Sequence, residues 1–293
     1  MILEPQFIAE QFLNSLQFSM LLFLLAIGLS VIFGLMDYLN LAHGTIYMLA
    51  AYLAYSLAQM GGNFWVALVF APLAAAAIGM ALYLLLLRRA ERATHLVQVL
   101  LTVGVIYAGT DILRMIYGDL PLGLSQPAAL SSPVNVFGVS YPSFRLFIIF
   151  LGLLIMGVLY FALERTRLGA LVRAGVDDRE TAETLGVNIG MVFMAVFAIG
   201  TYLAGLAGVV AAPIFGVYPG MDVSIIILVL VVVVVGGLGS LKGAIVGSLL
   251  IGFADTFGKL LLPQFAMIII YMVMAAVLVF RPSGLLPARQ FNR

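Results

Sequence analysis

The sequence of 293 residues contains no cysteine and few charged residues. A chain without cysteine forms no disulfide and offers no thiolate to a metal ion or as a nucleophile. Charged residues make up 9% of the chain, well below the roughly 25% of a typical soluble domain. The basic residues are too few and too scattered to follow a nucleic-acid backbone. No spacing typical of a metal site or of a nucleophile beside a base is present, which disfavours an enzyme.

Hydrophobic residues, in contrast, make up 64% of the chain, and the mean hydropathy is +1.18. A helix needs about 20 apolar residues to cross a bilayer, where only helices and closed barrels satisfy their backbone groups. The pattern predicts an all-α fold, a polytopic membrane helix bundle of about 8–10 transmembrane segments in a single domain over residues 1–293. Nine segments are expected, at residues 12–36, 41–60, 64–87, 96–117, 144–163, 191–212, 223–236, 243–262 and 265–280.

The basic residues indicate an orientation, because lysine and arginine are enriched in cytoplasmic loops. They gather after the third, fifth, seventh and ninth segments, at Arg88 and Arg89, in the loop 164–190, at Lys242 and at Arg281. Nine alternating segments place all of these on the cytoplasmic side. The acidic N-terminus then lies outside.

Two hydrophobic stretches are interrupted by glycines and polar residues, which predicts broken helices near 34–44 and 236–243. Both interruptions are expected to face the cytoplasm. They also suggest that segments 1–3 and 7–9 form a faint parallel repeat. The second interruption, "GGLGSLKG", lacks the Gly-Lys-Ser/Thr ending of a phosphate loop, and no soluble strand precedes it. Its glycines are typical of close helix packing or a tight turn.

The first interruption allows two interpretations. Asp37 and Asn40 are both good N-cap residues for a helix that starts near Leu41, so they can hold a turn at the cytoplasmic face. Alternatively, ionisable and polar residues inside a membrane often mark a transport path. The candidates for a translocation path, taken from both interruptions, are Asp37, Asn40, His43, Thr45, Gly236, Gly237 and Ser240.

A third of the charge lies in the loop 164–190, which holds nine of the 27 charged residues. Asp177 can cap a short helix, with Glu180 as its capping-box partner, and Gly186 can end that helix in the left-handed conformation. Asn188 can then cap the next membrane helix. Such a loop is either a solvated connection or a docking element.

The stretch "ETAETLG", Glu180–Gly186, resembles the Glu-Ala-Ala-x-x-x-Gly loop of ABC importer permeases. Thr181 replaces the first alanine, and the Ile-x-Leu-Pro that follows in the family is absent. The resemblance implies a coupling helix that sits in a groove of a cytoplasmic ATPase. It makes the candidates for ATPase coupling Arg173, Asp177, Arg179, Glu180, Ala182 and Gly186.

Four stretches extend the resemblance over nearly the whole chain: "LNLAHGTIYMLAAY", "VRAGVDDRETAETLGVN", "VVVGGLGSLKGAIVGSLLIG" and "FRPSGLLP". They look like the branched-chain amino acid ABC importer permeases of the LivH type. The resemblance implies uptake of leucine, isoleucine and valine across the bacterial inner membrane. It also implies a second related permease, two cytoplasmic ABC ATPases and an extracytoplasmic substrate-binding protein. ATP is then bound by the partner subunits, and the chain needs no cofactor of its own. Relatives that import urea, amides or other amino acids leave the substrate open.

Two further charge pairs fit more than one function. Asp111 and Arg114, and Asp255 and Lys259, have the spacing of ion pairs within one helix near its outer end. They can instead contact a binding protein or line an outer vestibule. The second hypothesis for the whole chain is an ion-coupled secondary transporter or channel, in which Asp37, Asp111 or Asp255 carries a proton or a sodium ion.

Overall fold

The structure, a computed structural model, describes residues 4–287 apart from 37, 39, 91, 92 and 137. Helices dominate the described residues, and the strands form one short antiparallel hairpin. The elements in chain order are α1 (Pro5–Met36), α2 (His43–Gln59), α3 (Phe64–Leu85), η1 (Leu87–Ala90), α4 (His95–Tyr117), η2 (Ala128–Leu130), β1 (Pro133–Val136), β2 (Val139–Pro142), α5 (Ser143–Arg165), α6 (Arg167–Asp177), α7 (Arg179–Thr184), α8 (Ile189–Phe215), α9 (Met221–Gly236), α10 (Leu241–Leu261), η3 (Pro263–Phe265) and α11 (Ala266–Phe280).

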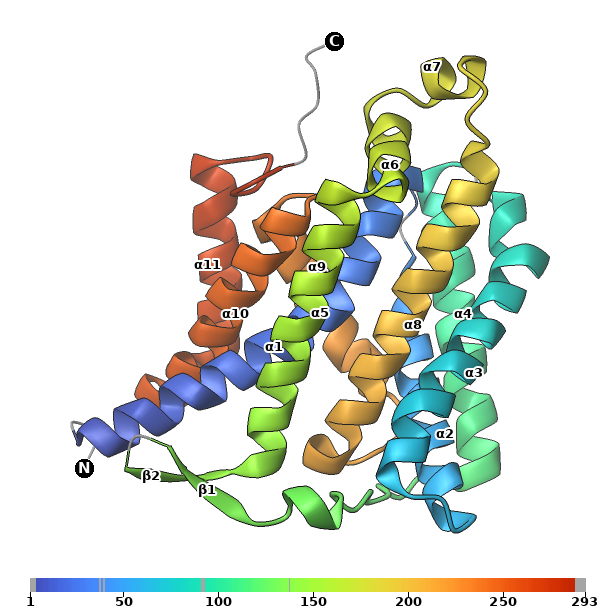
Figure 1. Cartoon of the computed structure of the whole chain (residues 1–293). Helices are drawn as coiled ribbons and strands as arrows, with labels where there is room; N and C mark the ends of the chain where they lie inside the picture. Colours follow the sequence, from blue (N-terminus) through green and yellow to red (C-terminus); the bar gives the residue numbers. More distant parts are fainter. Residues whose placement is uncertain (1–3, 37, 39, 91–92, 137, 288–293) are drawn as a thin grey trace.

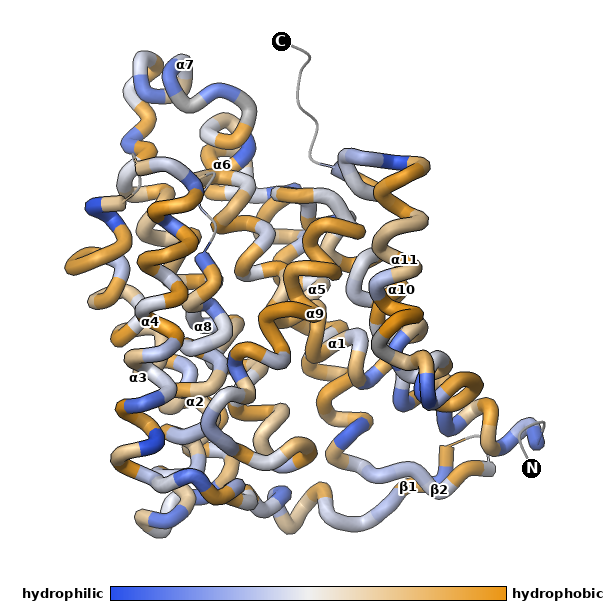
Figure 2. The backbone as a smooth tube through the Cα atoms, turned by 180° about the vertical axis from the view of Figure 1, so that it is seen from behind, coloured by the Kyte–Doolittle hydropathy of each residue, from blue (hydrophilic) through white to orange (hydrophobic). Residues whose placement is uncertain are grey.

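The predicted membrane helix bundle is confirmed, and each of the nine expected segments corresponds to one helix, namely α1–α5 and α8–α11. Six of the described helices are long and apolar enough to cross a membrane, and α9 and α11 are shorter apolar helices. The β-branched run in α9 forms a helix because the bilayer offers no partner for a lone strand. Hydrophobic residues dominate the helices, and hydrophilic residues gather at α7 and near the N-terminus (Figure 2).

The two ends of the bundle differ in charge. α6, α7 and the end of α11 lie at one end, and the N-terminus and the β1–β2 hairpin lie at the other (Figure 1). Leu87 of η1 shares a buried cluster with Val172 of α6, so the arginines of η1 belong to the same end as α6. The positive-inside rule assigns this end to the cytoplasm. The N-terminus and the hairpin then lie on the outer side, as the sequence predicts.

α1 forms the centre of the bundle. It packs against α5, α8, α9 and α10, and its residues from Met20 to Leu29 are buried. Because neighbours surround it there, α1 is apolar on every side from Met20 to Leu29.

The first interruption places the start of α2 deep inside the bundle. The Nε2 atom of His43 lies 3.2 Å from the carbonyl oxygen of Leu25. Leu25 precedes Met36, the last residue of α1, by eleven residues, or about 16 Å along the helix. α2 is therefore a half-helix that begins near mid-membrane and runs to the outer side. The expectation of a turn at the cytoplasmic face is wrong for this part of the interruption.

The predicted cap of α2 is also corrected. The N-cap residue is Ala42, whose side chain makes no capping hydrogen bond. Asn40 is 1% exposed and lies in the interior, because the chain has already re-entered the bundle at this point. Asp37, the other predicted cap, lies outside the described residues.

The second interruption is a tight turn at the cytoplasmic end. The hydroxyl of Ser240 caps α10 by accepting a hydrogen bond from the amide of Gly243, at 3.0 Å. Gly237 has a φ of +108°, which favours glycine, and Gly236 approaches the backbone of Gly243 closely. The two interruptions are thus structurally different, because one leads to a buried half-helix and the other to a compact turn. They do not support the parallel repeat.

Close helix packing depends on glycines such as Gly208 of α8. A Cβ atom at Gly208 would lie 2.1 Å from the carbonyl oxygen of Tyr47 in α2. A Cβ atom at Gly104 of α4 would meet nothing within 4 Å. Alanine favours a helix over glycine by about 1 kcal/mol at either position, so the two positions differ only in the space that they offer.

We expect Gly208→Ala to lower the Tm of the purified protein in detergent, because forced overpacking costs about 1–3 kcal/mol. Gly104→Ala is the matched control and should leave the Tm unchanged or raise it slightly. Thermal unfolding followed by size-exclusion chromatography compares the two variants. Equal Tm values would show that the α2–α8 contact does not limit stability.

Candidate functional site

The N-terminus of α9 meets the N-terminus of α2 inside the bundle. A Cβ atom at Gly44, in the first turn of α2, would lie 2.8 Å from the carbonyl oxygen of Asp222 in α9. Gly220, with a φ of +92°, is the N-cap of α9 and turns the chain into this position. Helix N-termini carry unpaired amides and a partial positive charge. Two of them therefore create a positive potential near mid-membrane, where water is scarce.

A buried carboxylate lies at this junction. Asp222 is 1% exposed. Its Oδ2 atom accepts hydrogen bonds from the hydroxyls of Thr45 in α2, at 3.2 Å, and Thr110 in α4, at 3.4 Å. Its Oδ1 atom has no hydrogen-bond partner among the described residues. The two helix termini and the two hydroxyls offset part of the cost of burying this charge.

Sequence reasoning identified Thr45 but missed Asp222. Asp222 directly precedes the membrane segment expected at residues 223–236, a position at which an acidic residue is usually in contact with water. A glycine followed by an acidic residue in the first turn of an apolar helix is the signal that could have identified it. Its depth depends on the half-helix α2, which hydropathy alone does not predict.

The other candidates from the first interruption contact α1. His43 is fully buried, and its ring bonds the carbonyl of Leu25, whereas its Nδ1 atom has no partner in the described part of the chain. Asn40 lies nearby in sequence, and its Oδ1 atom is buried without a described partner. A Cβ atom at Gly28 would lie 3.0 Å from the His43 ring, so Gly28 provides the space for this ring. These groups add polarity close to the Asp222 junction.

The candidates from the second interruption lie elsewhere. Gly236, Gly237 and Ser240 belong to the turn at the cytoplasmic end, where the amide of Leu286 donates to the carbonyl of Gly236, at 2.9 Å. A Cβ atom at Gly34, near the end of α1, would lie 2.4 Å from the Cα of Gly239. The structure thus separates the predicted path residues into an interior group and a cytoplasmic group.

A polar seam continues from Asp222 toward the outer side, between α2 and α4. The rings of Tyr52 and Tyr117 lie 4.7 Å apart, and the hydroxyls of Ser56 and Tyr117 are 2.6 Å apart. Leu122, in the loop after α4, pairs its backbone with Val217, just before α9. These contacts close the seam on the outer side of the junction.

The predicted charge pairs near the outer side are confirmed as pairs within one helix. Arg114 lies 3.1 Å from Asp111 and also contacts Asp119, and Lys259 lies 2.7 Å from Asp255. No group of three or more His, Cys, Asp and Glu side chains that could hold a metal is found among the described residues.

Asn14 of α1 connects the outer hairpin to the bundle. Tyr141 of β2 donates a hydrogen bond to the side-chain oxygen of Asn14 at 3.0 Å, and Arg145 donates to the same oxygen at 2.6 Å. Burial raises the pKa of the Tyr141 hydroxyl to about 12. It therefore remains a donor at physiological pH.

At the cytoplasmic end, the short helix α7 begins one residue later than predicted. Asp178 is its N-cap residue and accepts a hydrogen bond from the amide of Thr181, at 3.0 Å. The expected cap, Asp177, is instead the last residue of α6. Because the cap is Asp178, Thr181 and not Glu180 occupies the third helical position, where a capping-box partner would lie. The observed helix is Arg179–Thr184.

The end of α7 follows the prediction. Gly186 has a φ of +86°, and its amide donates to the carbonyl of Glu183, at 3.0 Å. The amide of Val187 donates to the carbonyl of Ala182, at 3.1 Å. This pair of hydrogen bonds is a Schellman motif, which satisfies the last carbonyls of the helix. Asn188 caps α8 by accepting from the amide of Met191, at 3.1 Å, as the sequence predicts.

α7 presents charge outward and is held by one small side chain. Glu180 is exposed, and Leu185 is 78% exposed. Ala182, in contrast, is 3% exposed and belongs to a buried cluster with Phe193 of α8. Arg173 of α6 donates to the carbonyl of Leu163 and lies 4.0 Å from Glu164. The side chains of the two remaining coupling candidates, Asp177 and Arg179, lie outside the described residues.

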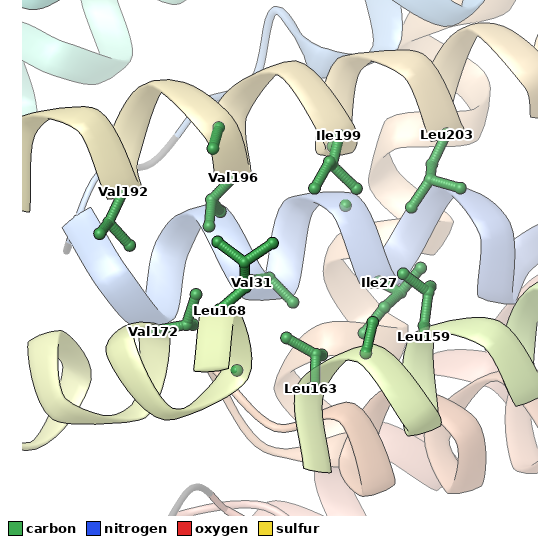
Figure 3. Close-up of a pocket in the computed structure, with 15 residues that line it drawn as sticks. Ile27, Val31, Leu159, Leu163, Leu168, Val172, Val192, Val196, Ile199 and Leu203 are labelled. Atoms are coloured by element: carbon green, nitrogen blue, oxygen red, sulfur yellow. The ribbon is translucent and has the colours of Figure 1, made fainter. Parts of the chain in front are cut away.

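Two adjoining cavities separate α6 from the core of the bundle. An apolar cavity of about 90 Å³ lies between α1, α5, α6 and α8 (Figure 3). Its lining residues Val31, Leu163 and Val172 also border a larger cavity of about 790 Å³, which reaches Ser240 and Lys242 at the second interruption. α6 also packs against the end of α1, where a Cβ atom at Gly175 would lie 2.9 Å from Leu35. α6 therefore connects α7 to α1, and it also packs against α5 and α8 beside the cavities.

Comparison with known proteins gives consistent results. A family model described as branched-chain amino acid transport system / permease component matches residues 11–278. The high-affinity branched-chain amino acid transport system permease protein BraD of Pseudomonas aeruginosa is 28% identical over 94% of this chain and 95% of that protein. The corresponding permease protein LivH of Escherichia coli is 27% identical over 94% of both chains, and LivM of the same organism is 28% identical over 92% of this chain and 68% of its own length. Among solved structures, PsaBC from Streptococcus pneumoniae in complex with Fab covers 91% of this chain and 89% of that chain, with 14% identity and a TM-score of 0.49.

We expect Thr45→Val to destabilise the protein by about 1.5–3 kcal/mol, because it removes a hydrogen bond to a buried charged group. Thr201→Val is the matched control: Thr201 is equally buried, but its hydroxyl bonds only carbonyls of its own helix. Denaturant unfolding in detergent measures both variants. A cost that is the same for the two variants would contradict a stabilising role for the Thr45–Asp222 contact.

Proposed function

Because the chain belongs to the family of permease components of branched-chain amino acid transport systems, we propose that it forms part of the translocation path of an ATP-driven importer. It is a multi-pass protein of the bacterial inner membrane. The proposed substrates are leucine, isoleucine and valine, or closely similar hydrophobic neutral amino acids. Urea, short amides and other amino acids are the alternatives within the same family.

One observation carries the ATP-driven part of this proposal. α7 is a short helix, capped at both ends, that stands at the cytoplasmic end of the bundle and exposes Glu180 and Leu185. A helix of six residues is not stable alone in water. Its caps and the Ala182 contact therefore keep α7 helical, although contact with solvent alone would not. A groove on a partner protein would explain this shape. The resemblance of Glu180–Gly186 to the coupling loop of ABC importers makes that partner an ATPase.

The proposed assembly contains a second related permease, two cytoplasmic ABC ATPases and a substrate-binding protein on the outer side. The similarity of the chain to both LivH and LivM of Escherichia coli, each named as a permease protein of a branched-chain amino acid system, supports a pair of related permeases. ATP would be bound by the partner subunits, and the chain itself would need no cofactor.

The contacts suggest how ATP hydrolysis would reach the membrane. Closure of the ATPases would displace α7, and α6 would follow because the two helices are joined by Asp178 alone. α6 packs on the end of α1, and the adjoining cavities leave it room to move. α1 in turn holds the start of α2 through the His43–Leu25 contact. Movement of α1 would therefore alter the junction of α2 and α9.

The alternative of ion-coupled transport receives less support from the pairing of the carboxylates. Asp111 and Asp255, two of the three residues predicted to carry an ion, are each engaged by a basic residue of the same helix. The third, Asp37, lies outside the described residues.

We expect proteoliposomes that contain the complete complex to accumulate leucine only with ATP inside and binding protein outside. Radiolabelled leucine uptake with and without ATP measures this, and urea and short amides serve as competing solutes. Uptake driven by an imposed proton or sodium gradient, without ATP, would contradict the proposal.

We expect Gly186→Ala to uncouple ATP hydrolysis from uptake, because alanine in the left-handed conformation costs about 1–2 kcal/mol and disturbs the end of α7. Gly61→Ala is a close control. Gly61 has a φ of +85°, ends α2 with the same pair of hydrogen bonds, and lies at the outer end of the bundle. The measurement is the ratio of leucine imported to ATP hydrolysed. The same ratio in both variants would contradict the coupling role of α7.

A further inference from the structure

We propose that the Asp222 carboxylate, which Thr45 and Thr110 hold in place, binds the positively charged ammonium group of the transported solute near mid-membrane. The inference rests on the proposed function, because it takes an amino acid as the solute. It adds a binding site and names the chemical group that the site recognises.

Asp222 is not the N-cap residue of its helix. Gly220 is the N-cap residue of α9 and has no side chain with which to cap it, and the Asp222 carboxylate also interacts with backbone amides of the first turn, including that of Val223. Asp222 lies two residues further on, and its carboxylate points to hydroxyls on two other helices. A neutral side chain could accept the same two hydrogen bonds at lower cost, because a buried charge loses its hydration. The structural role therefore does not require a charge.

One carboxylate oxygen is available to a ligand. The hydroxyls of Thr45 and Thr110 both donate to Oδ2, and Oδ1 is buried with no hydrogen-bond partner in the described part of the chain. A buried acceptor without a donor is rare, and each case needs an explanation. An ammonium group supplies a donor and a compensating positive charge, which the two helix N-termini provide only in part.

The cover over Asp222 on the α4 side is thin. α4 packs against α2 and η1, and its residue Thr110 is only half-buried. A Cβ atom at Gly109 would lie 2.5 Å from Thr45, so the small residue allows α4 to close over the junction. A small outward movement of α4 would expose the carboxylate.

The exposed face of α4 carries polar and charged side chains, which are unusual on a surface that faces lipid. Tyr107 is 68% exposed, and the side chains of Asp111 and Arg114 are 58% and 49% exposed. Charged residues in membrane helices usually face protein or a water-filled space. We therefore place an aqueous route from the outer side along α4 to Asp222.

The chemistry of the site also suits a transporter. A carboxylate in a medium of low dielectric attracts a cation strongly, which would slow its release. The two threonine hydroxyls stay on Oδ2 and share the charge, which weakens this attraction. Ile226, buried one turn further along α9, offers an apolar contact to a branched side chain.

The test uses the complete complex in proteoliposomes with the variants Asp222→Asn, Asp222→Glu and, as a control, Asp255→Asn. Asp255 is also a buried aspartate, but it is paired with Lys259 near the outer end of α10. We expect Asp222→Asn to keep the ATPase activity that the loaded binding protein stimulates and to lose leucine uptake at least tenfold. Asp222→Glu should restore part of the uptake, and Asp255→Asn should behave like the wild type.

The outcomes separate the inference from the proposed function. If the wild-type complex imports leucine and Asp222→Asn imports it equally well, the inference is wrong and the proposed function stands. If the wild-type complex imports no amino acid with ATP, the proposed function itself fails. Uptake by the wild type that needs a proton gradient would assign Asp222 to proton transfer and would also overturn the inference.

A second variant covers the case in which Asp222→Asn does not fold. Thr110→Val keeps the carboxylate and removes one of its two competing donors. We expect the KM for leucine uptake to fall severalfold, because more of the carboxylate charge is available to the ammonium group. A KM that is unchanged or higher would overturn the inference.

Discussion

The structure depends on supplying partners to the free amides of two helix N-termini that lie inside a membrane. A helix N-terminus in hydrocarbon leaves amides without partners, and each such group is costly because no water reaches it. In this chain the starts of α2 and α9 lie together, and the Asp222 carboxylate lies between them. The opposite charges stabilise each other, and the hydroxyls of Thr45 and Thr110 complete the junction. The half-helix α2 can exist at this depth because of this arrangement.

Helix α1 connects the junction of α2 and α9 to the cytoplasmic end of the bundle. Other helices surround α1, and His43 contacts it at Leu25. α6 and Gly239 contact the cytoplasmic end of α1. A junction held by electrostatics and a few hydrogen bonds can be rearranged more easily than a close-packed apolar core. This difference makes the junction the natural place for a change of access, and it makes α1 the element that links it to α7.

Much of this architecture follows from the sequence, because hydropathy and helix signals are local. The nine helices at the expected segments, the left-handed end of α7 at Gly186 and the cap of α8 at Asn188 are all predicted correctly, although only six of the described helices are long and apolar enough to span a membrane. The cap of α7 is off by one residue, because adjacent aspartates offer equal local signals and only the end of α6 decides between them. The depth of α2 and the role of Asp222 could not be predicted. They depend on contacts between helices far apart in the sequence, which no local pattern contains.

The central claim is that the nucleotide state at the cytoplasmic end controls access to the α2–α9 junction. The absence of cysteine makes a direct measurement possible, because a single cysteine introduced in place of Thr110 is the only thiol in the chain. The rate at which a small, water-soluble thiol reagent added outside modifies this cysteine should be measured in the full complex, with and without a non-hydrolysable ATP analogue. The account predicts rates that differ severalfold between the two states, with leucine protecting the cysteine in the faster one. Equal rates in both states, with no protection by leucine, would contradict it.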